Sequence, residues 1–559
     1  MVTPTEHAAV QRILILGGGF AGVNVAMQLE KRLRHVPNAE ISLVNQENYF
    51  VFQPLLAEVV SGNIGLLDTV NPIRRLLKRA RLYVREIDSI DLKARTVTLT
   101  PGFRPRPDIL QYDHLVLALG NVTDFRGIPG LPEHAMAFKS LADAVQLRNH
   151  LLHALEEASI ETDAEVRLAL LTFVVAGGGF SGVEVAAEMN DFLRRIAKEY
   201  RQVDPRAIRV ILIHNGDQVL HRELGAGLSK YATDVLRKKG VELMLGRKLK
   251  AASRDAAILD NGQRIPTRTL VSTVPSSPNP LIDSLDVLKD RGRPVVDGFL
   301  EMASHPSVWA LGDCAMVPMG GEGEVCPPTA QHAIRQATTV AVNIAASITG
   351  SKKQTFSFKG LGKMGSIGHH SAVAELFNRF RVSGFFAWIM WRSVYWAKLP
   401  GTARKIRVGV AWLLDLIIPP DTVELKLHGA AGVTQAHFEA GDVVFNQGDL
   451  GDAFYIITEG EAEVLVESEG SSRLVAVLSA GEYFGELALL NNLRRSATVR
   501  CKKAMTVLSM RRRDFNALTS NLPSLKQSFQ QVTYAQEPTP SDCPANASHS
   551  TDEQISQEL

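Results

Sequence analysis

The stretch RILILGGGFAGVNVAMQLE (residues 12–30) opens with an apolar run, passes through glycines and continues with apolar residues at helical spacing. This order predicts a buried strand, a tight turn and a helix. Gly17, Gly19 and Gly22 have the spacing of a dinucleotide-binding turn, in which the first glycine makes the turn, the second admits a pyrophosphate and the third lets the helix pack closely. The helix N-terminus then faces the anion. A single copy of this motif could equally be a packing device.

The same pattern occurs again as FVVAGGGFSGVEVAAEMN at residues 173–190. Its glycines, Gly177, Gly179 and Gly182, lie 160 residues after those of the first copy. A second copy in matching context makes a mere packing role much less plausible. The pair predicts one tightly held flavin dinucleotide and one exchanging nicotinamide dinucleotide, placed so that a hydride passes between them.

Further apolar runs alternate with helical stretches, namely ISLVN (41–45), HLVLALG (114–120) and RVILIHNG (209–216). This alternation predicts parallel sheets with crossover helices. We therefore expect an α/β fold with two Rossmann-like dinucleotide-binding domains.

Size and composition set outer limits on the function. A chain of 559 residues exceeds what one hydrophobic core usually organises, so three or more domains are expected. The 61 Lys and Arg residues against 59 Asp and Glu leave a net charge of +2, which argues against a nucleic-acid partner. Four scattered cysteines without a CxxC pair predict neither disulfides nor a metal site. The start of the chain lacks the pattern of a secretory signal, and no apolar run reaches about 18 residues, so we expect neither export nor a membrane span.

Over residues 10–345 the chain resembles the two-dinucleotide-binding flavoproteins, through ALGNVTDFRGIPG (118–130) and WALGDCAMVP (309–318). The resemblance implies that the first loop binds FAD and the second binds NAD(P)H. It also implies that Gly312 and Asp313 hold the ribityl chain and the pyrophosphate region of the flavin. The further residues expected at the flavin site are Asn45, Gln53 and Gly120.

Within these flavoproteins, the chain resembles type II NADH dehydrogenases in NYFVFQPLLAEVVSG (48–62), PPTAQHAIRQA (327–337) and a Trp-rich C-terminal region. The resemblance implies that Ala330, Gln331 and Ala333, the AQxA element, lie near the flavin ring at a quinone pocket. It implies a FAD-dependent NAD(P)H:quinone oxidoreductase that pumps no protons and lies peripherally on the cytoplasmic face of the cell inner membrane.

Two residues are expected to be catalytic, Glu184 and Gln331. Glu184, in the GVE of the second loop, matches a carboxylate placed against the flavin ring from the nicotinamide side. The alternatives are a solvated helix carboxylate for Glu184 and a helix-surface amide for Gln331. His332 is expected to be structural, as a lone histidine more often is.

The strand that follows each glycine motif lacks the acidic residue that usually binds the adenosine ribose. ISLVN ends in Asn45, close to Glu47, and RVILIHNG carries His214 where glutamate is common. Without a carboxylate to repel a 2′-phosphate, we expect less discrimination against NADPH than the family norm. Pro275 stands where relatives often keep a glycine beside the nicotinamide, so the choice between NADH and NADPH stays open.

Residues 384–418 differ from the rest of the chain, because four of its five tryptophans lie here among basic side chains. Amphipathic rings and basic residues suit helices that lie in the plane of a membrane interface. We expect this segment to contact the lipid bilayer through Trp388, Trp391 and Trp396, and so to reach a membrane quinone. A buried helical hairpin or a dimer interface is the alternative, and a homodimer is compatible with the sequence.

From Phe438 onward, short alternating strands with glycine turns predict a small all-β unit. Residues 433–530 resemble the cyclic-nucleotide-binding β-roll of kinase regulatory subunits and catabolite activator proteins, through FGELALLNNLRRSATV (484–499). The resemblance implies that Arg495 neutralises the cyclic phosphate and that Glu486 accepts a hydrogen bond from the ribose 2′-hydroxyl. The other residues expected at this site are Gly485, Leu487 and Ser496. We expect the ligand to be cAMP rather than cGMP.

These patterns divide the chain into a two-part FAD-binding domain, an NAD(P)H-binding domain, a membrane-anchoring region, a cyclic-nucleotide-binding domain and a polar tail that we expect to be disordered. The FAD-binding domain covers 1–135 and 286–348, and the NAD(P)H-binding domain covers 136–285. The membrane-anchoring region covers 349–428, the cyclic-nucleotide-binding domain 429–532 and the tail 533–559. Two other functions stay open at this point. One is a cyclic-nucleotide and redox sensor with slow turnover, and the other is an NAD(P)H diaphorase or oxidase without a quinone partner.

Overall fold

The structure is a computed structural model. It describes residues 9–100, 108–123, 125, 127–273, 276–319, 324–377, 379–425, 433–449, 451, 453–468, 471–490, 494–511 and 515. The chain divides into two compact units, Met1–Leu427 and His428–Leu559. The predictions for Pro275 and for the tail 533–559 fall outside the described residues.

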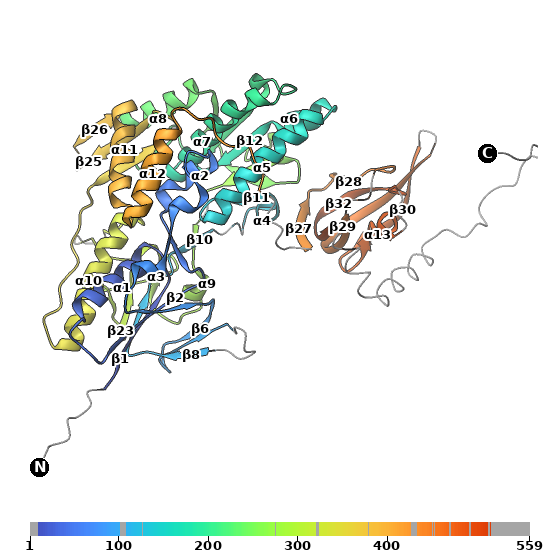
Figure 1. Cartoon of the computed structure of the whole chain (residues 1–559). Helices are drawn as coiled ribbons and strands as arrows, with labels where there is room; N and C mark the ends of the chain where they lie inside the picture. The colour runs from blue at the N-terminus through green and yellow to red at the C-terminus, as the bar shows by residue number, and fades with distance from the viewer. Residues whose placement is uncertain are drawn as a thin grey trace, which may run out of the picture. The chain divides into compact units, whose positions relative to one another are not determined.

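One sheet of the first unit forms around the first glycine motif. Its strand order is β22-β23-β9-β1-β2-β5, and every pair except β22–β23 is parallel. The strands are β1 (Gln11–Leu16), β2 (Ala39–Asn45), β5 (Arg81–Val84), β9 (His114–Leu117), β22 (Glu301–Met302) and β23 (His305–Ala310). Helices α1 (Phe20–Arg32) and α10 (Ala330–Thr349) pack against each other (Figure 1). Segments from both sides of the second motif thus complete one domain.

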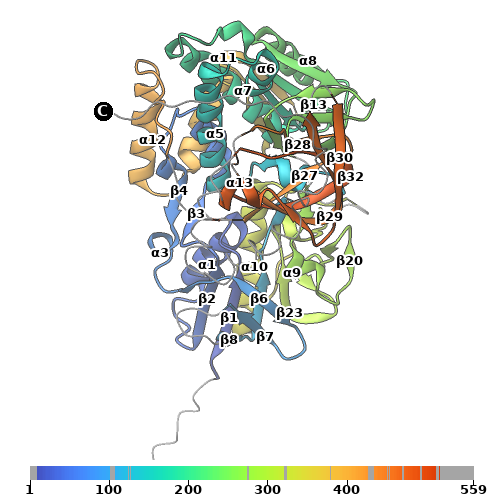
Figure 2. The same ribbon diagram turned by 90° about the vertical axis from the view of Figure 1, so that its right-hand side faces the viewer.

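A second sheet forms around the second glycine motif, in the order β11-β18-β12-β13-β14 with all pairs parallel. Its strands are β11 (Ala135–Ala137), β12 (Thr172–Ala176), β13 (Arg209–His214), β14 (Val241–Leu245) and β18 (Thr269–Ser272). The helices of this domain include α5 (Leu141–Ile160), α7 (Phe180–Ile196) and α8 (Ala226–Lys238). Strand β13 and helix α7 lie at the opposite end of the unit from β1 and β2 (Figure 2). The predicted parallel sheets with crossover helices are confirmed.

Each glycine motif makes the turn between its strand and its helix. Gly17 and Gly177 have φ of +106° and +120°, which L side chains rarely adopt. A Cβ atom added to Gly22 would lie 1.9 Å from the carbonyl oxygen of Gly17, and one added to Gly182 would lie 1.9 Å from that of Gly177. Both helices therefore pack directly onto their turns, and only glycine allows this distance.

A small antiparallel sheet and two helices complete the first unit. They are β24 (Gly362–Ser366), β25 (Ala372–Leu376), β26 (Phe380–Ser383), α11 (Gly384–Lys398) and α12 (Thr402–Leu414). Helices α11 and α12 contact each other (Figure 1). In the described part of the chain, no helix combines the length and apolarity needed to cross a membrane.

The tryptophans of α11 and α12 do not lie where the composition predicted. Trp388 is 7% exposed, Trp391 is 1% exposed and Trp412 is 9% exposed, whereas Trp396 is 41% exposed. The prediction that Trp388 and Trp391 contact lipid is therefore wrong, because both rings pack into the protein. Four aliphatic residues of α12, Ile406, Val410, Leu413 and Leu414, are exposed instead, whereas Val408 is buried.

The second unit is the predicted small all-β unit. Its sheet has the order β27-β32-β29-β30, with β28 and β31 paired at its sides, and all pairs are antiparallel. The elements are β27 (Val433–Phe438), β28 (Val443–Phe445), β29 (Ala453–Ser468), β30 (Ser471–Ser479), β31 (Tyr483–Phe484), α13 (Glu486–Leu490) and β32 (Thr498–Arg511). Phe438, Tyr455 and Met505 lie in its own hydrophobic core.

The glycine contacts predict a difference between two alanine substitutions in the same loop. Gly22→Ala places a Cβ against the backbone of Gly17 and should destabilise the first unit by about 3 kcal/mol, as overpacking does. Gly19→Ala should cost less than about 1 kcal/mol, because Gly19 has no atom within 4 Å of an added Cβ. Tryptophan fluorescence during urea unfolding measures this, since all five tryptophans belong to the first unit. Equal losses for the two variants would contradict the role assigned to Gly22.

Candidate functional site

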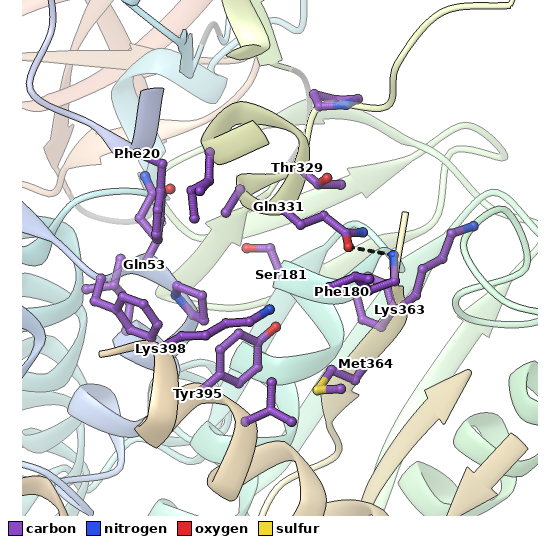
Figure 3. A pocket seen from close by; sticks show the side chains of 18 of the residues that line it. Phe20, Gln53, Phe180, Ser181, Thr329, Gln331, Lys363, Met364, Tyr395 and Lys398 are labelled. Atoms are coloured by element: carbon purple, nitrogen blue, oxygen red, sulfur yellow. Dashed lines mark hydrogen bonds between the residues drawn. The ribbon is translucent and has the colours of Figure 1, made fainter. Parts of the chain in front are cut away.

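A cavity of about 890 Å³ opens where the helices of the two glycine motifs begin. Phe20 is the first residue of α1 and Phe180 is the first residue of α7, and both side chains line the cavity (Figure 3). The N-terminus of α10, the strand β24 and the helix α11 supply further parts of the wall. The cavity thus lies between both dinucleotide-binding folds.

Several predicted site residues meet in this cavity. The ones that line it are Gln53, Glu184, Ala330 and Gln331. Gly312, Asp313 and Ala333 line a small hollow that shares Thr329 with the cavity. The predicted glycines of the two loops lie one turn away, at the start of α1 and α7.

Glu184 is half-buried on α7, and the backbone N–H of Ser366 donates a hydrogen bond to its Oε1 at 3.1 Å. Burial raises the pKa of Glu184 to about 8, and the neighbouring carboxylates of Glu188 and Glu58 add to the shift. The carboxyl group therefore carries a proton at neutral pH. It is not the solvated helix carboxylate of the alternative interpretation.

Gln331 is tied to the strand that forms the opposite wall. Its Oε1 accepts a hydrogen bond from the backbone N–H of Leu361 at 3.1 Å (Figure 3). Its Nε2 donates to the carbonyl of Gly362, also at 3.1 Å. The amide is held in one orientation and is not a free surface group. His332 is buried beside it and bonds to the Thr329 hydroxyl at 2.7 Å, and burial lowers its pKa, in keeping with the expected structural role.

Sequence reasoning missed several cavity residues. Tyr395 and Lys398 reach the cavity from α11, within the segment that composition assigned to lipid contact (Figure 3). Burial raises the pKa of Tyr395, so it stays a phenol. No spacing in the sequence connects α11 with the glycine motifs. Phe20 and Phe180 could have been found, because the phenylalanine is part of the repeated GGGF pattern.

A buried charge cluster connects α11 and α12 with α2 and α7. Arg392 of α11 donates to Oε1 of Glu58 at 3.1 Å, and Trp412 of α12 donates to Oε2 at 2.6 Å. Glu58 belongs to α2 (Leu56–Val60), whose neighbours Leu56 and Ala57 line the cavity. At the end of α12, Asp415 accepts from Arg195 of α7 at 2.9 Å.

Comparison with known proteins agrees with this geometry. The pyridine nucleotide-disulphide oxidoreductase family matches residues 11–337, and the NDH2 C-terminal domain matches residues 361–418. The type II NADH:quinone oxidoreductase NdhA of Mycobacterium tuberculosis is 31% identical over 427 residues, which cover 73% of this chain and 88% of the relative. The chain belongs to the type II NADH:quinone oxidoreductase family.

Other members and their folds extend the agreement. A probable NADH dehydrogenase of Dictyostelium discoideum is 29% identical over 419 residues, which cover 74% of this chain and 90% of the relative. The structure of NDH2 from Plasmodium falciparum in complex with NADH superposes with a TM-score of 0.68 at 19% identity, covering 74% of this chain and 99% of that one. At that identity the superposition shows a shared fold. The first unit thus has the fold of type II NADH:quinone oxidoreductases.

This member of the type II NADH:quinone oxidoreductases carries an additional C-terminal unit. A cyclic nucleotide-binding domain matches residues 435–521. The guanidinium of Arg495 is buried, donates to the carbonyls of Gly485 at 2.9 Å and Ala453 at 2.8 Å, and lies over the ring of Phe445 at 3.9 Å. Glu486 is buried at the start of α13, Leu487 is half-buried and Ser496 is exposed. Gly485, Glu486 and Leu487 thus lie at the start of α13, and Arg495 and Ser496 lie just before β32.

The pKa of Glu184 predicts how the stability of the first unit depends on pH. In the unfolded chain this carboxyl group titrates near 4.5 and in the folded protein at about 8, so the folded state binds more protons between these values. Stability should therefore fall by a few kcal/mol as the pH rises from 5 to 8.5. Glu184→Gln should match wild type at pH 5 and melt at a higher temperature than wild type at pH 8.5.

The measurement is the Tm by tryptophan fluorescence at both pH values. The control is Glu40→Gln, at an exposed position of β2, which should follow wild type at both. A Glu184→Gln variant with the full pH dependence of wild type would show that other groups cause it.

Proposed function

We propose that the first unit moves a hydride from a nicotinamide dinucleotide in the second loop to FAD in the first loop, and then two electrons to a membrane quinone. One observation carries the proposal, namely that the helices of both dinucleotide loops begin at a single cavity lined by Glu184 and Gln331. FAD, when bound, would supply the redox chemistry of both half-reactions.

The first loop fits FAD. A Cβ added at Gly19 or at Gly120 would meet no atom within 4 Å, which leaves room for a pyrophosphate beside the backbone. Helix α1 begins at this place without a side-chain cap at Gly19, so its first N–H groups would be available to a pyrophosphate. Lys139 lines the cavity and lies close enough to Asp313 for their charges to interact, which suits a site for polar and anionic groups.

The residues of the cavity suit quinone reduction. A reduced quinone carries two added hydrogens, so a proton must reach the site in addition to the hydride. Glu184 holds a proton at neutral pH because burial raises its pKa to about 8. Phe20, Phe180 and Tyr395 give the wall an aromatic and largely apolar surface that favours a quinone ring over water.

Helix α12 and the turn after it form the proposed membrane contact. Their exposed apolar side chains are Ile406 (65% exposed), Val410 (48%), Leu413 (65%), Leu414 (47%), Leu416 (56%), Ile417 (84%) and Ile418 (52%). With Phe385 and Phe386 of α11 they make an apolar surface, here called the α12 ridge, that would enter the bilayer interface. The ridge replaces the buried tryptophans as the proposed lipid contact and would place the cavity where a quinone can enter.

Anaerobic spectroscopy tests the function. NADH should bleach the flavin absorbance of the purified protein, and a quinone embedded in liposomes should restore it. Ile406→Ser, Leu413→Ser and Ile417→Ser together should abolish sedimentation with liposomes and slow reoxidation by the embedded quinone at least about tenfold, because the apolar side chains that enter the interface are gone.

The matched control replaces three apolar residues that are exposed elsewhere, Ile109 (63%), Ile160 (75%) and Leu288 (72%), with serine. This variant should still sediment with liposomes. Reduced flavin that no quinone reoxidises would favour a diaphorase or a sensor. Equal sedimentation of both triple variants would rule out the ridge as the anchor.

We further propose that a cyclic nucleotide, cAMP rather than cGMP, binds the second unit and changes turnover by the first. The support is the buried pair of Glu486, which begins α13, and Arg495, which lies before β32. A cyclic phosphate would meet the arginine, and the ribose 2′-hydroxyl would meet the carboxylate. The charge of Arg495 lowers the pKa of Glu486 while burial, the larger effect, raises it.

Calorimetry on the full-length protein tests this site. Arg495→Ala should weaken cAMP binding ten- to a hundredfold, roughly the 1.5–3 kcal/mol of a charge-assisted hydrogen bond. Arg494→Ala removes the exposed neighbouring arginine and should change the affinity less than about threefold. Steady-state kinetics with and without cAMP tests the coupling. If cAMP binds but changes neither kcat nor KM, the domain does not regulate catalysis and its ligand serves another purpose.

A further inference from the structure

Asn45 and His214 occupy equivalent places in the two dinucleotide-binding folds. The backbone N–H of Gly18 donates to Oδ1 of Asn45 at 2.7 Å, and the N–H of Gly178 donates to Nδ1 of His214 at 3.2 Å. Each residue ends the strand that lies parallel to the loop strand, β2 beside β1 and β13 beside β12. In such folds this position contacts the adenosine ribose of the bound dinucleotide. His214 therefore lies where the second fold meets the 2′ position of its ligand.

A second histidine stands against the first. Nε2 of His214 lies 3.0 Å from Nδ1 of His221, which follows in the loop after β13. Because Nδ1 of His214 accepts from Gly178, its proton is on Nε2 and is donated to His221. Both rings are then neutral. The carbonyl of Gln218 lies 3.2 Å from Nδ1 of His221 and would accept a further proton placed there. The N–H of His214 would then face a second N–H across 3.0 Å unless an anion accepted it.

Charged groups of both signs surround this pair. Arg222 is exposed next to His221 in sequence, and the exposed Arg247 donates its backbone N–H to the carbonyl of His214 at 3.0 Å. Burial lowers the pKa of His214, Arg222 and a protonated His221 lower it further, and Asp217 raises it. The other carboxylate nearby, Glu223, faces Gly179 at the start of α7, on the pyrophosphate side of the loop. A polyvalent anion bound here would raise the pKa of the histidine pair and so favour its protonated form.

We propose that the end of β13 is a binding subsite for the 2′-phosphate of NADPH, in which the His214–His221 pair takes up a proton as the phosphate binds. The proposal rests on the donor site assigned above to the second loop. The phosphate would accept N–H groups from the charged pair and from Arg222, and so relieve the contact between the two rings. NADH has a ribose hydroxyl at this place and brings no charge that favours the protonated pair.

The consequence is a choice of donor that depends on pH. The ratio of kcat/KM for NADPH to kcat/KM for NADH should fall about tenfold between pH 6.5 and 8.5, as one shared proton is lost. This window lies above the pKa of the phosphate itself, near 6. His221→Gln should lower the ratio at pH 6.5 and make it nearly independent of pH. His214→Glu should lower it more than tenfold at every pH, because a carboxylate repels the phosphate.

Binding of adenosine 2′,5′-bisphosphate, compared with 5′-AMP, gives a readout that does not need turnover. Calorimetry in two buffers of different ionisation enthalpy should show proton uptake with the bisphosphate and none with 5′-AMP. Proton uptake should vanish in His221→Gln. The control is His153→Gln, which removes a half-exposed histidine of α5 and should leave the ratio and its pH profile as in wild type. The flavin content of each variant reports whether it has folded.

A ratio that does not change with pH in wild type, or bisphosphate binding without proton uptake, would overturn the proposal. These outcomes are distinct from failure of the proposed function, in which NADH itself would not reduce the flavin. If His221→Gln keeps the wild-type profile while wild type takes up a proton, the titrating group is not this pair, and the proposal fails in that form.

Discussion

The first unit depends on the distance between a helix and the turn before it. At Gly22 and at Gly182 a single methyl group would overlap a backbone carbonyl, so each helix starts in direct contact with its strand-to-helix turn. This contact directs the N-termini of α1 and α7 toward one cavity, since the first residue of each helix, Phe20 or Phe180, lines it. Two copies of the same constraint therefore position two dinucleotide sites around one reaction space.

A second constraint holds the far wall of that space. Glu58 is buried, and a buried carboxylate is costly unless it is hydrogen-bonded and paired. Arg392 and Trp412 satisfy it from α11 and α12, which brings Tyr395 into the cavity wall. The same contacts turn the tryptophans inward and leave the aliphatic side of α12 exposed. Residues 384–418, whose composition suggests a membrane interface, thus contain tryptophans that pack inside the protein and aliphatic side chains that form an apolar surface.

Both proposed regulatory features use polar groups that the protein already satisfies internally. His214 accepts from Gly178 and donates to His221, and Arg495 donates to the carbonyls of Gly485 and Ala453. A phosphate at either place would have to exchange these hydrogen bonds for its own. Such an exchange costs less than desolvating an unpaired charge, and it makes binding responsive to the charge state of the site.

The sequence by itself determined the features that depend on local spacing. The duplicated glycine motif, read with its apolar strand and amphipathic helix, was enough to predict two parallel sheets and two dinucleotide loops, because a turn without side chains is a local requirement. Glu184 and Gln331 were also identified from motifs, but whether they are buried or solvated was open. Only the tertiary structure decided that, since the backbone groups of Ser366, Leu361 and Gly362 that hold them lie far away in sequence. The tertiary structure alone also showed three further features: Tyr395 in the cavity wall, Trp388 and Trp391 packed inward, and His214 paired with His221. Each depends on which residue of a loop or of a distant segment lies within a few ångströms. Hydrophobic periodicity carries no information about such contacts.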